Sequence, residues 1–370
     1  MSKKIYVIAA EASADLHTSR IISQLKHLHS DWQFYGWGGQ KMKDAGVNIL
    51  TRYEDVSFMG FYEVIKNIKT IFSLFKKTKK ELLELKPDYV LLVDYPGFNL
   101  RLAKWLSEHN FPVYYFISPQ LWAWKPGRIE TIRKYITKLI VILPFEKIYF
   151  QERNLDVLYA GHPLLDTITN FEPDLNFRNK NNLNCQSIIA LLPGSRKQEI
   201  ETMLPFYLEA SLHFPKFQIV IAGLKQHREL YEKLTVKYNS VKIIYNQNYN
   251  LLHHARFAIV TSGTATLETA LFNVPEIVCY KGSSISYHIA KRLIQVKYIS
   301  LVNLIMDEEI VKELIQNECT VKNITEECKK LNKLELRRKM KLKYQVLHSR
   351  LGNGNAVEQI STFLELQWNK

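Results

Sequence analysis

Short apolar runs of strand length recur along the whole chain, and segments with helical periodicity lie between them. This alternation is typical of βαβ units, in which helices connect the parallel strands of a sheet. It therefore predicts an α/β protein with mostly parallel sheets. The predicted strands are residues 5–10, 89–93, 113–117, 138–143 and 157–160, and a second series covers 187–192, 218–222, 242–245, 258–260 and 276–279.

The segment 171–185 separates the two series of strands. It is rich in Asn, Asp and Pro and poor in large apolar residues, as linkers are. A chain of 370 residues that is 46% hydrophobic can form two cores. We therefore expect two Rossmann-like domains facing a cleft, at residues 1–172 and 173–351, with a C-terminal helix at 352–370 that joins the first domain.

The formal net charge of +14 calls for an anionic partner. A nucleic acid, a negatively charged membrane surface or a phosphorylated substrate would each satisfy it, so charge alone does not choose among them. The four cysteines have no close metal-ligand spacing, and no apolar signal segment precedes them. These features predict reduced thiols in a cytoplasmic protein.

Ligands of open α/β sheets collect at the carboxyl ends of the strands, so the residues after each predicted strand are the candidates for a site. The first strand is followed by 11–15, Glu-Ala-Ser-Ala-Asp, where small residues permit a tight turn. Ser13 or Asp15 would cap a helix that begins near Leu16. A cap alone and a ligand contact are equally compatible with this segment.

Asp94 directly follows the apolar run 89–93. A carboxylate at a strand end can accept the proton of an attacking hydroxyl, which is the general-base step that a sugar acceptor needs. The alternative is an aspartate that opens a turn before Pro96. No second carboxylate stands at a spacing that would indicate a glycoside hydrolase.

The segment 118–128 places two tryptophans and two cations after another strand: Trp122, Trp124, Lys125 and Arg128. Aromatic faces stack on sugars or cover acyl chains, and the cations can bind phosphate. A plain loop would be unusually aromatic, so we favour a binding role.

The turn 192–196, Leu-Pro-Gly-Ser-Arg, follows the first strand of the second series. Gly194 lets the backbone approach a ligand, the amides at Ser195 and the helix start can donate to phosphate, and Arg196 can bind phosphate through two hydrogen bonds. No Gly-Lys-Ser/Thr follows, which disfavours a P-loop NTPase.

A second turn of small residues follows the strand 258–260. The amides around Ser262, Gly263 and Thr264 suit a diphosphate, and Glu268 in the next helix could accept ribose hydroxyls. A helix cap is the alternative. Together with the Arg196 turn in the same half, the segment favours a nucleotide site.

A basic amphipathic helix is predicted over 61–75. It could lie in a membrane interface, or pack on the core with its lysines in solvent. A second basic run, 329–343, has leucine instead of aromatic residues between its charges and indicates a solvated helix face. The apolar face of the first helix consists of Phe61, Val64, Ile65, Ile68, Phe72 and Phe75.

These motifs in this order resemble the lipid-A-disaccharide synthase family, glycosyltransferase family 19, over nearly the whole chain. The Trp-Ala-Trp segment and the Pro-Gly-Ser-Arg turn are its most specific parts. The matching segments are 11–13, 55–60, 94–99, 118–124, 143–146, 161–163, 192–196, 262–268 and 298–304.

The resemblance implies a GT-B fold and an inverting transfer from UDP-2,3-diacylglucosamine to 2,3-diacylglucosamine 1-phosphate, without metal or other cofactor. It makes Asp94 the base and gives the UDP donor to Arg196 and its partners. It also implies docking of residues 59–75 on the inner face of the inner membrane, and a possible homodimer. The donor residues would be Gly194, Ser195, Arg196, Ser262, Gly263, Thr264, Glu268 and Asn303, and the acceptor residues Glu11, Ser13, Asp15, Met59, Trp122, Trp124, Lys125 and Arg128.

Two other functions compete with this one. Another UDP-sugar enzyme of the same fold, such as a UDP-N-acetylglucosamine 2-epimerase or another lipid-sugar transferase, is disfavoured by the tryptophan loop and the amphipathic helix. A basic nucleic-acid-binding protein is disfavoured because the aromatic residues cluster after strands instead of along a basic surface. Ala14 stands where the family pattern has glycine, and its β-carbon would narrow the approach to the first turn.

Overall fold

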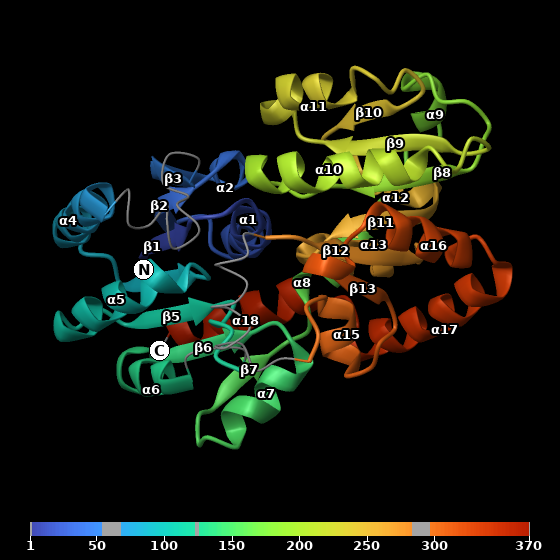
Figure 1. The fold of residues 1–370 in the computed structure, drawn as a ribbon. Coiled ribbons are helices and arrows are strands. Elements are labelled where there is room, and N and C mark those ends of the chain that lie inside the picture. Colours follow the sequence, from blue (N-terminus) through green and yellow to red (C-terminus); the bar gives the residue numbers. More distant parts are fainter. Residues whose placement is uncertain (1, 54–67, 123–125, 283–296, 370) are drawn as a thin grey trace. The chain divides into compact units, whose positions relative to one another are not determined.

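The computed structural model describes residues 2–53, 68–122, 126–282 and 297–369. The chain forms two compact units (Figure 1): unit 1 comprises Met1–Asp166 and Gly352–Lys370, and unit 2 comprises Thr167–Leu351. Each unit contains one parallel sheet connected by helices. The prediction of an α/β chain with two parallel-sheet domains is therefore confirmed.

Unit 1 contains a seven-stranded sheet in the order β3-β2-β1-β4-β5-β6-β7. The strand order reverses its direction between β1 and β4, which pair at the centre of the sheet. Such a reversal is a topological switch point, where ligands bind in open α/β sheets. The elements of unit 1 are β1 (Lys4–Ala9), α1 (Ala12–Leu28), β2 (Gln33–Gly38), α2 (Gln40–Asp44), β3 (Val47–Arg52), α4 (Ile68–Leu85), β4 (Tyr89–Val93), α5 (Pro96–Glu108), β5 (Val113–Phe116), η2 (Pro126–Arg128), α6 (Ile129–Tyr135), β6 (Lys138–Val141), α7 (Pro144–Gln151), β7 (Val157–Tyr159), α8 (Pro163–Thr169) and α18 (Ala356–Trp368).

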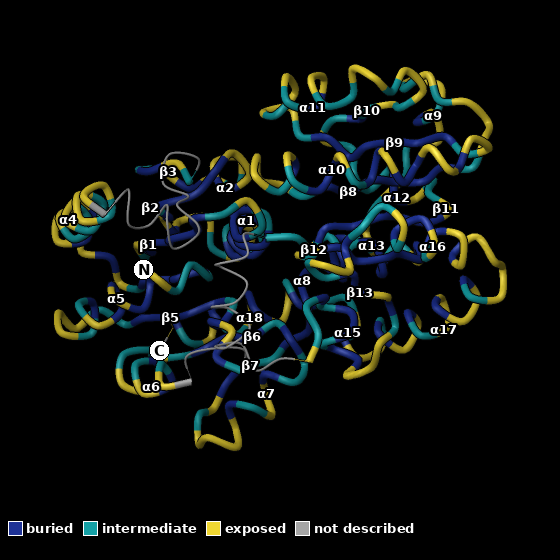
Figure 2. Tube along the Cα trace, viewed as in Figure 1, coloured by how far each residue is buried: buried dark blue, intermediate teal, exposed yellow. Residues whose placement is uncertain are grey.

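Both faces of this sheet are covered. Alternate residues of a strand point to opposite faces, and along β1 Ile5 and Val7 pack into one apolar cluster while Tyr6 and Ile8 pack into the other. All four are fully buried, and buried residues follow one another along the inner strands of the sheet (Figure 2). Burial on both faces explains why β1 is a continuous apolar run instead of an alternating one.

Helix α18 is distant in sequence from the rest of unit 1, yet it packs against α1. Its residues Ile360, Leu364 and Trp368 belong to the same apolar cluster as Ile21 of α1. The Trp368 ring stacks on Tyr89 at 5.6 Å, and the Tyr89 hydroxyl donates to the Trp368 carbonyl oxygen at 2.9 Å.

Unit 2 contains a six-stranded sheet in the order β10-β9-β8-β11-β12-β13. Its switch point lies between β8 and β11, which pair in parallel. The elements are α9 (Phe177–Lys180), β8 (Ile188–Leu192), α10 (Lys197–Ser211), β9 (Gln218–Gly223), η3 (Lys225–His227), α11 (Arg228–Thr235), β10 (Lys242–Tyr245), α12 (Asn248–His254), β11 (Ala255–Thr261), α13 (Thr264–Leu271), β12 (Glu276–Tyr280), α15 (Leu301–Met306), β13 (Lys312–Ile315), η4 (Gln316–Glu318), α16 (Val321–Leu331) and α17 (Leu334–Leu351).

The structure corrects the interpretation of 171–185 as a linker. This segment contains α9, and Phe177 is fully buried in the core cluster of unit 2 beside Ile188. Its Asn and Asp residues form the turns around a short helix, and Asn182, just after that helix, has a positive φ of 50°. The segment is thus a packed part of unit 2.

None of the helices within the described ranges is both long and apolar enough to cross a bilayer.

Candidate functional site

Four of the predicted polar turns follow the strands that pair at the two switch points. In unit 1, Ala9 at the end of β1 pairs with Val93 at the end of β4, so the turn at Glu11 and Asp94 start at the same edge of the sheet. In unit 2, Leu192 at the end of β8 pairs with Val260 of β11. The Arg196 turn and the Ser262 turn therefore also start at one sheet edge.

The backbone holds Asp94 in an unusual conformation. Asp94 and Tyr95 both have a φ of +47°, in the left-handed region that non-glycine residues rarely adopt. The Asp94 carbonyl oxygen accepts hydrogen bonds from the Tyr115 hydroxyl at 2.6 Å and from Asn99 Nδ2 at 2.7 Å. Strained backbone that several contacts hold in place is common at functional sites.

The electrostatics of Asp94 suit a general base. Burial raises its pKa to about 6, although a backbone hydrogen bond involving Tyr95 acts in the opposite direction. The carboxylate is therefore mostly ionised at neutral pH, yet it is a stronger base than an exposed aspartate.

Glu146 organises the tryptophan loop. Its Oε1 accepts hydrogen bonds from the Ser118 hydroxyl at 2.6 Å and from Trp122 Nε1 at 3.2 Å, and its Oε2 accepts the amides of Leu143 and Ile142. Burial raises the pKa of this fully buried carboxyl, whereas these donors lower it. Glu146 was not singled out from the sequence, because its partner Trp122 is distant along the chain.

The remaining acceptor residues after β5 are only partly described. The Trp122 ring packs edge-on against Phe145 at 4.9 Å. Arg128 is half-buried in η2, and burial lowers the pKa of its guanidinium. Trp124 and Lys125 lie outside the described residues.

The first turn differs from its prediction. Helix α1 begins at Ala12 with Glu11 as its N-cap, so Ser13 and Asp15 lie inside the helix instead of capping it. Ala14 is buried in the apolar cluster of unit 1, so its β-carbon faces the core and does not narrow the turn.

Asp15 connects α1 to the segment after β2. Its carboxylate accepts the amides of Gly39 at 2.7 Å, Met42 at 3.1 Å and Lys41 at 3.2 Å. The side chain is buried. These contacts give Asp15 a role in holding α2, which the sequence did not indicate.

Glu199 closes the turn that contains Arg196. Its Oε2 accepts the amides of Ser195 at 3.0 Å and Arg196 at 3.2 Å, and its Oε1 lies 3.0 Å from Arg196 Nη1. Gly194 has a φ of +107°, and a β-carbon there would lie 2.5 Å from Glu199 Oε2. The amides of Ser195 and Arg196, which the sequence assigns to phosphate, thus donate to a carboxylate in the first turn of α10.

The turn after β11 leaves Gly263 and Thr264 exposed at the start of α13. Glu268, one turn later, accepts a hydrogen bond from the Tyr249 hydroxyl at 2.9 Å. Burial raises the pKa of Glu268, and this hydrogen bond lowers it. Tyr249 is a further residue of this region that the sequence did not reveal.

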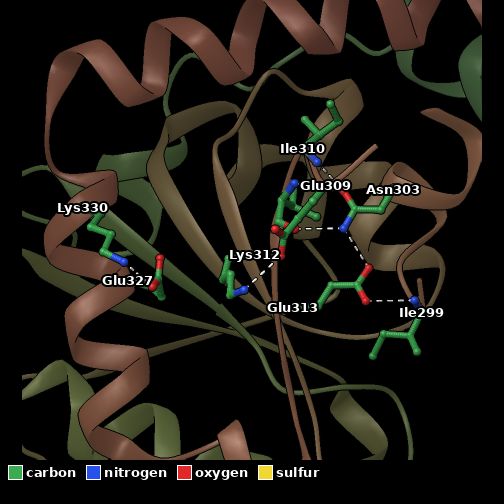
Figure 3. Close-up of polar contacts among 9 residues, drawn as sticks. Ile299, Asn303, Glu309, Ile310, Lys312, Glu313, Glu327 and Lys330 are labelled. Carbon is green, nitrogen blue, oxygen red and sulfur yellow. Dashed lines mark hydrogen bonds and ion pairs between the residues drawn. The ribbon is translucent and has the colours of Figure 1, made fainter. Parts of the chain in front are cut away.

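The direct UDP contact predicted for Asn303 is wrong. Asn303 is fully buried, and its Nδ2 donates to the Val311 carbonyl oxygen at 2.9 Å and to Glu313 Oε1 at 2.8 Å (Figure 3). Its Oδ1 accepts the amides of Ile310 and Val311. With both hydrogens and the oxygen used inside unit 2, no polar atom is left for a nucleotide.

The amphipathic helix also differs in part from its prediction. Helix α4 extends to Leu85, and Phe75 is partly buried, because it packs on Phe98 at 4.6 Å and on the core. Phe72 is 69% exposed. Met59, Phe61, Val64 and Ile65 lie outside the described residues, and the side chain of Ile68 is not described.

His162 is buried beside His17, with ring centroids 6.2 Å apart. Its Nδ1 accepts the Leu164 amide at 3.1 Å. Burial and the neighbouring His17 lower the pKa of His162 to about 3, so it is neutral at physiological pH.

The sequence pattern of the family described as lipid-A-disaccharide synthetase matches residues 5–364. A curated lipid-A-disaccharide synthase from Acidobacterium capsulatum is 37% identical over 349 residues, and the match covers 88% of this chain and 86% of that protein. The corresponding protein of Coxiella burnetii strain Dugway 5J108-111 is 32% identical over 377 residues, with 97% of both chains covered.

Solved structures support the fold. The UDP-GlcNAc 2-epimerase from Neisseria meningitidis bound to UDP-GlcNAc matches with a TM-score of 0.66 and 15% identity, over 98% of this chain and 99% of that chain. A glycosyltransferase from Rickettsia africae matches with a TM-score of 0.57 and 12% identity, over 100% and 99%. At such identities these matches show the GT-B fold alone, whereas the sequence matches show that the chain belongs to the lipid-A-disaccharide synthase family.

Proposed function

We propose that the chain condenses UDP-2,3-diacylglucosamine with 2,3-diacylglucosamine 1-phosphate to give the β-1,6-linked disaccharide 1-phosphate and UDP. One observation carries this proposal: the polar turns of each unit follow the two strands of its switch point. Switch points are where nucleotides and substrates bind in sheets of this type. The family membership supplies the identity of the substrates.

In the proposed mechanism, Asp94 takes the proton of the acceptor 6-hydroxyl. The oxygen then attacks the anomeric carbon from the face opposite UDP, so the new C–O bond forms as the bond to the diphosphate breaks and the configuration inverts. A pKa of about 6 supports this role, because the base is ionised before the reaction and holds the proton after it.

The departing UDP carries the developing negative charge. Arg196 and the amides at Gly263 and Thr264 are our candidates to stabilise it, and Glu268 is our candidate for the ribose hydroxyls. Fixed donors of this kind stabilise charge in a transition state without a metal ion. We therefore expect full activity in the presence of EDTA.

Helix α4 is our candidate for contact with the inner face of the inner membrane. Phe72 is exposed among lysines, and Lys69 and Lys76 are exposed as well. Lys77 differs from these lysines, because it donates to Leu50 O at 3.2 Å and to Thr51 Oγ1 at 3.0 Å and so connects α4 to β3. An exposed aromatic side chain between cations suits an anionic lipid surface.

The reaction is tested by incubating the protein with both acylated substrates and detecting the disaccharide and UDP by mass spectrometry. Arg196→Ala should lower kcat/KM by about 100-fold or more, as the loss of a transition-state donor does. Interconversion of UDP-N-acetylglucosamine and its 2-epimer, with no disaccharide formed, would refute the proposal.

The membrane contact needs its own test. Phe72→Ser should reduce co-sedimentation with vesicles that contain phosphatidylglycerol, whereas Leu212→Ser should not. Leu212 is 60% exposed on unit 2 and matches Phe72 as an exposed apolar residue. Equal binding of both variants and the wild type would exclude Phe72 from the contact.

A further inference from the structure

Glu313 of β13 holds the segment that leads into α15. Its Oε2 accepts the Ile299 amide at 2.9 Å, and its Oε1 accepts Asn303 Nδ2 at 2.8 Å (Figure 3). The same Oε1 also accepts the Ser300 amide at 3.0 Å. The Glu313 side chain is 7% exposed. Hydrogen bonds to a carboxylate are stronger than neutral ones, and burial shields them from water.

The same segment contacts the turn after β11. The Ser262 hydroxyl donates to the Ile299 carbonyl oxygen at 3.1 Å. The Ile299 amide therefore donates to Glu313, and the Ile299 carbonyl oxygen accepts from Ser262. A single residue thus connects the buried carboxylate to the residue that precedes Gly263.

Asn303 fixes the other side of this arrangement. Its side chain binds Glu313 and also the backbone of Val311, just before Glu313 along the chain. Ser300 caps α15 by accepting the Asn303 amide at 3.2 Å. The place of Glu313 is therefore determined from its own strand and from α15.

We infer that Glu313 is a positioning residue of the nucleotide site. Its carboxylate sets the position of Ile299, and through Ile299 it sets Ser262, whose amide donates to the Cys279 carbonyl oxygen. The amides of Gly263 and Thr264, which follow Ser262 in the same turn, are the proposed diphosphate donors. Glu313 itself is buried behind this segment and acts through it. The inference rests on the proposed function, since it takes that turn to be the UDP site.

Glu276 on the adjacent strand β12 provides a matched control. It is also a fully buried glutamate of unit 2, but neither of its carboxylate oxygens has a hydrogen-bond partner within the described part of the chain. Glu276→Gln and Glu313→Gln are thus the same substitution at two buried positions of one sheet, and only Glu313 has contacts to the Ile299 segment.

The experiment measures the affinity of the full-length protein for UDP by calorimetry, and the KM values of both substrates, below the unfolding temperature of each variant. Glu313→Gln replaces an acceptor oxygen by an NH2 group that faces backbone or side-chain donors. We expect its UDP affinity to fall about 10-fold to 100-fold, as displacement of a site by about 1 Å can cause. In Glu313→Gln the donor KM should rise, while the acceptor KM should keep its wild-type value. Glu276→Gln should have the wild-type UDP affinity and wild-type KM values for both substrates.

A purely structural role would lower the amount of active protein without changing KM or UDP affinity. Wild-type affinity and donor KM in folded Glu313→Gln would therefore overturn the inference. If Glu313→Gln does not fold, the experiment uses Glu313→Asp, which keeps the charge but has a shorter side chain. Glu313→Asp should show a smaller loss of UDP affinity and a smaller rise of the donor KM. Wild-type values in this variant would again overturn the inference. Wild-type protein that does not bind UDP at all would instead refute the proposed function.

Discussion

The carboxylate of Asp166 accepts the backbone amide of Val357 at 2.7 Å and that of Ala356 at 3.1 Å. These are the first amides of α18, so a residue of α8 caps a helix that is almost 200 positions later in the sequence. A negative charge at a helix start also interacts favourably with the helix dipole. Asp166 thus fastens α18 to unit 1.

Asp166→Ala should lower the free energy of unfolding by about 1–2 kcal/mol, which is the usual effect of losing an N-cap. Urea denaturation followed by circular dichroism measures this change. Glu358→Gln, in the first turn of the same helix, removes an exposed negative charge and should change stability much less. If Asp166→Ala lowers the free energy of unfolding no more than Glu358→Gln does, the cap contributes little to stability.

The activity should fall in acid as Asp94 takes up a proton. Because burial raises the pKa of Asp94 to about 6, the base is lost as the pH falls through that value. We expect kcat/KM to drop about 10-fold for each pH unit below 6, and Asp94→Asn to lower it about 100-fold to 10,000-fold at neutral pH. A pH series of initial rates on folded protein measures both.

A rate that is constant from about pH 5 to pH 8 would contradict the assignment of Asp94 as the base. Asp88 provides a control, since its carboxylate accepts the Lys4 amide at the opposite end of β4. Asp88→Asn should leave the shape of the pH profile unchanged.

Gly194→Ala should weaken UDP binding. The φ of +107° disfavours any side chain, and the new β-carbon would displace Glu199 from the amides that it caps. The strain alone costs about 1–3 kcal/mol. At Gly97, in the first turn of α5, a β-carbon would meet no described atom within 4 Å. Calorimetric titration with UDP should therefore show a loss for Gly194→Ala and none for Gly97→Ala.

Glu276→Gln should stabilise the protein more at pH 8 than at pH 5. Burial raises the pKa of Glu276 well above its ordinary value, so the folded state keeps a proton that the unfolded state releases. Stability is then lost as the pH rises above about 4.5, by at most about 1.4 kcal/mol for each pH unit. Thermal denaturation of the wild type and of Glu276→Gln at pH 5 and pH 8 measures this effect, and the Tm difference between the two proteins should be larger at pH 8. An equal Tm difference at the two pH values would show that Glu276 is not protonated in the folded state.

The sequence predicted the inner strands that are continuous apolar runs, and also the edge strands β7 and β10. It missed β2, β3 and β13, which lie at or beside sheet edges. Gly36 interrupts the apolar run of β2, and β13 is only four residues long with two charges. Such strands are determined by pairing with their neighbours, which local composition does not show.

The sequence also predicted where site residues would lie, since a turn after a strand can be recognised locally. It could not show which side chains those turns contact. Glu146, Glu199 and Glu313 each accept three or more hydrogen bonds, and for Glu146 and Glu313 the partners include residues more than ten positions away. Asn303 was misassigned for the same reason, because a buried amide with four partners looks no different in sequence from one that contacts a ligand.

The path of the chain has a consequence for biosynthesis. Helix α18 leaves the ribosome only after all of unit 2, yet it covers the apolar face that Ile21, Tyr89 and Tyr114 contribute to. While the second unit is translated, helix α1 can cover this face of the sheet, but the part of the face that α18 covers stays exposed. During that interval the exposed part is a place where chaperones, or neighbouring nascent chains, can attach.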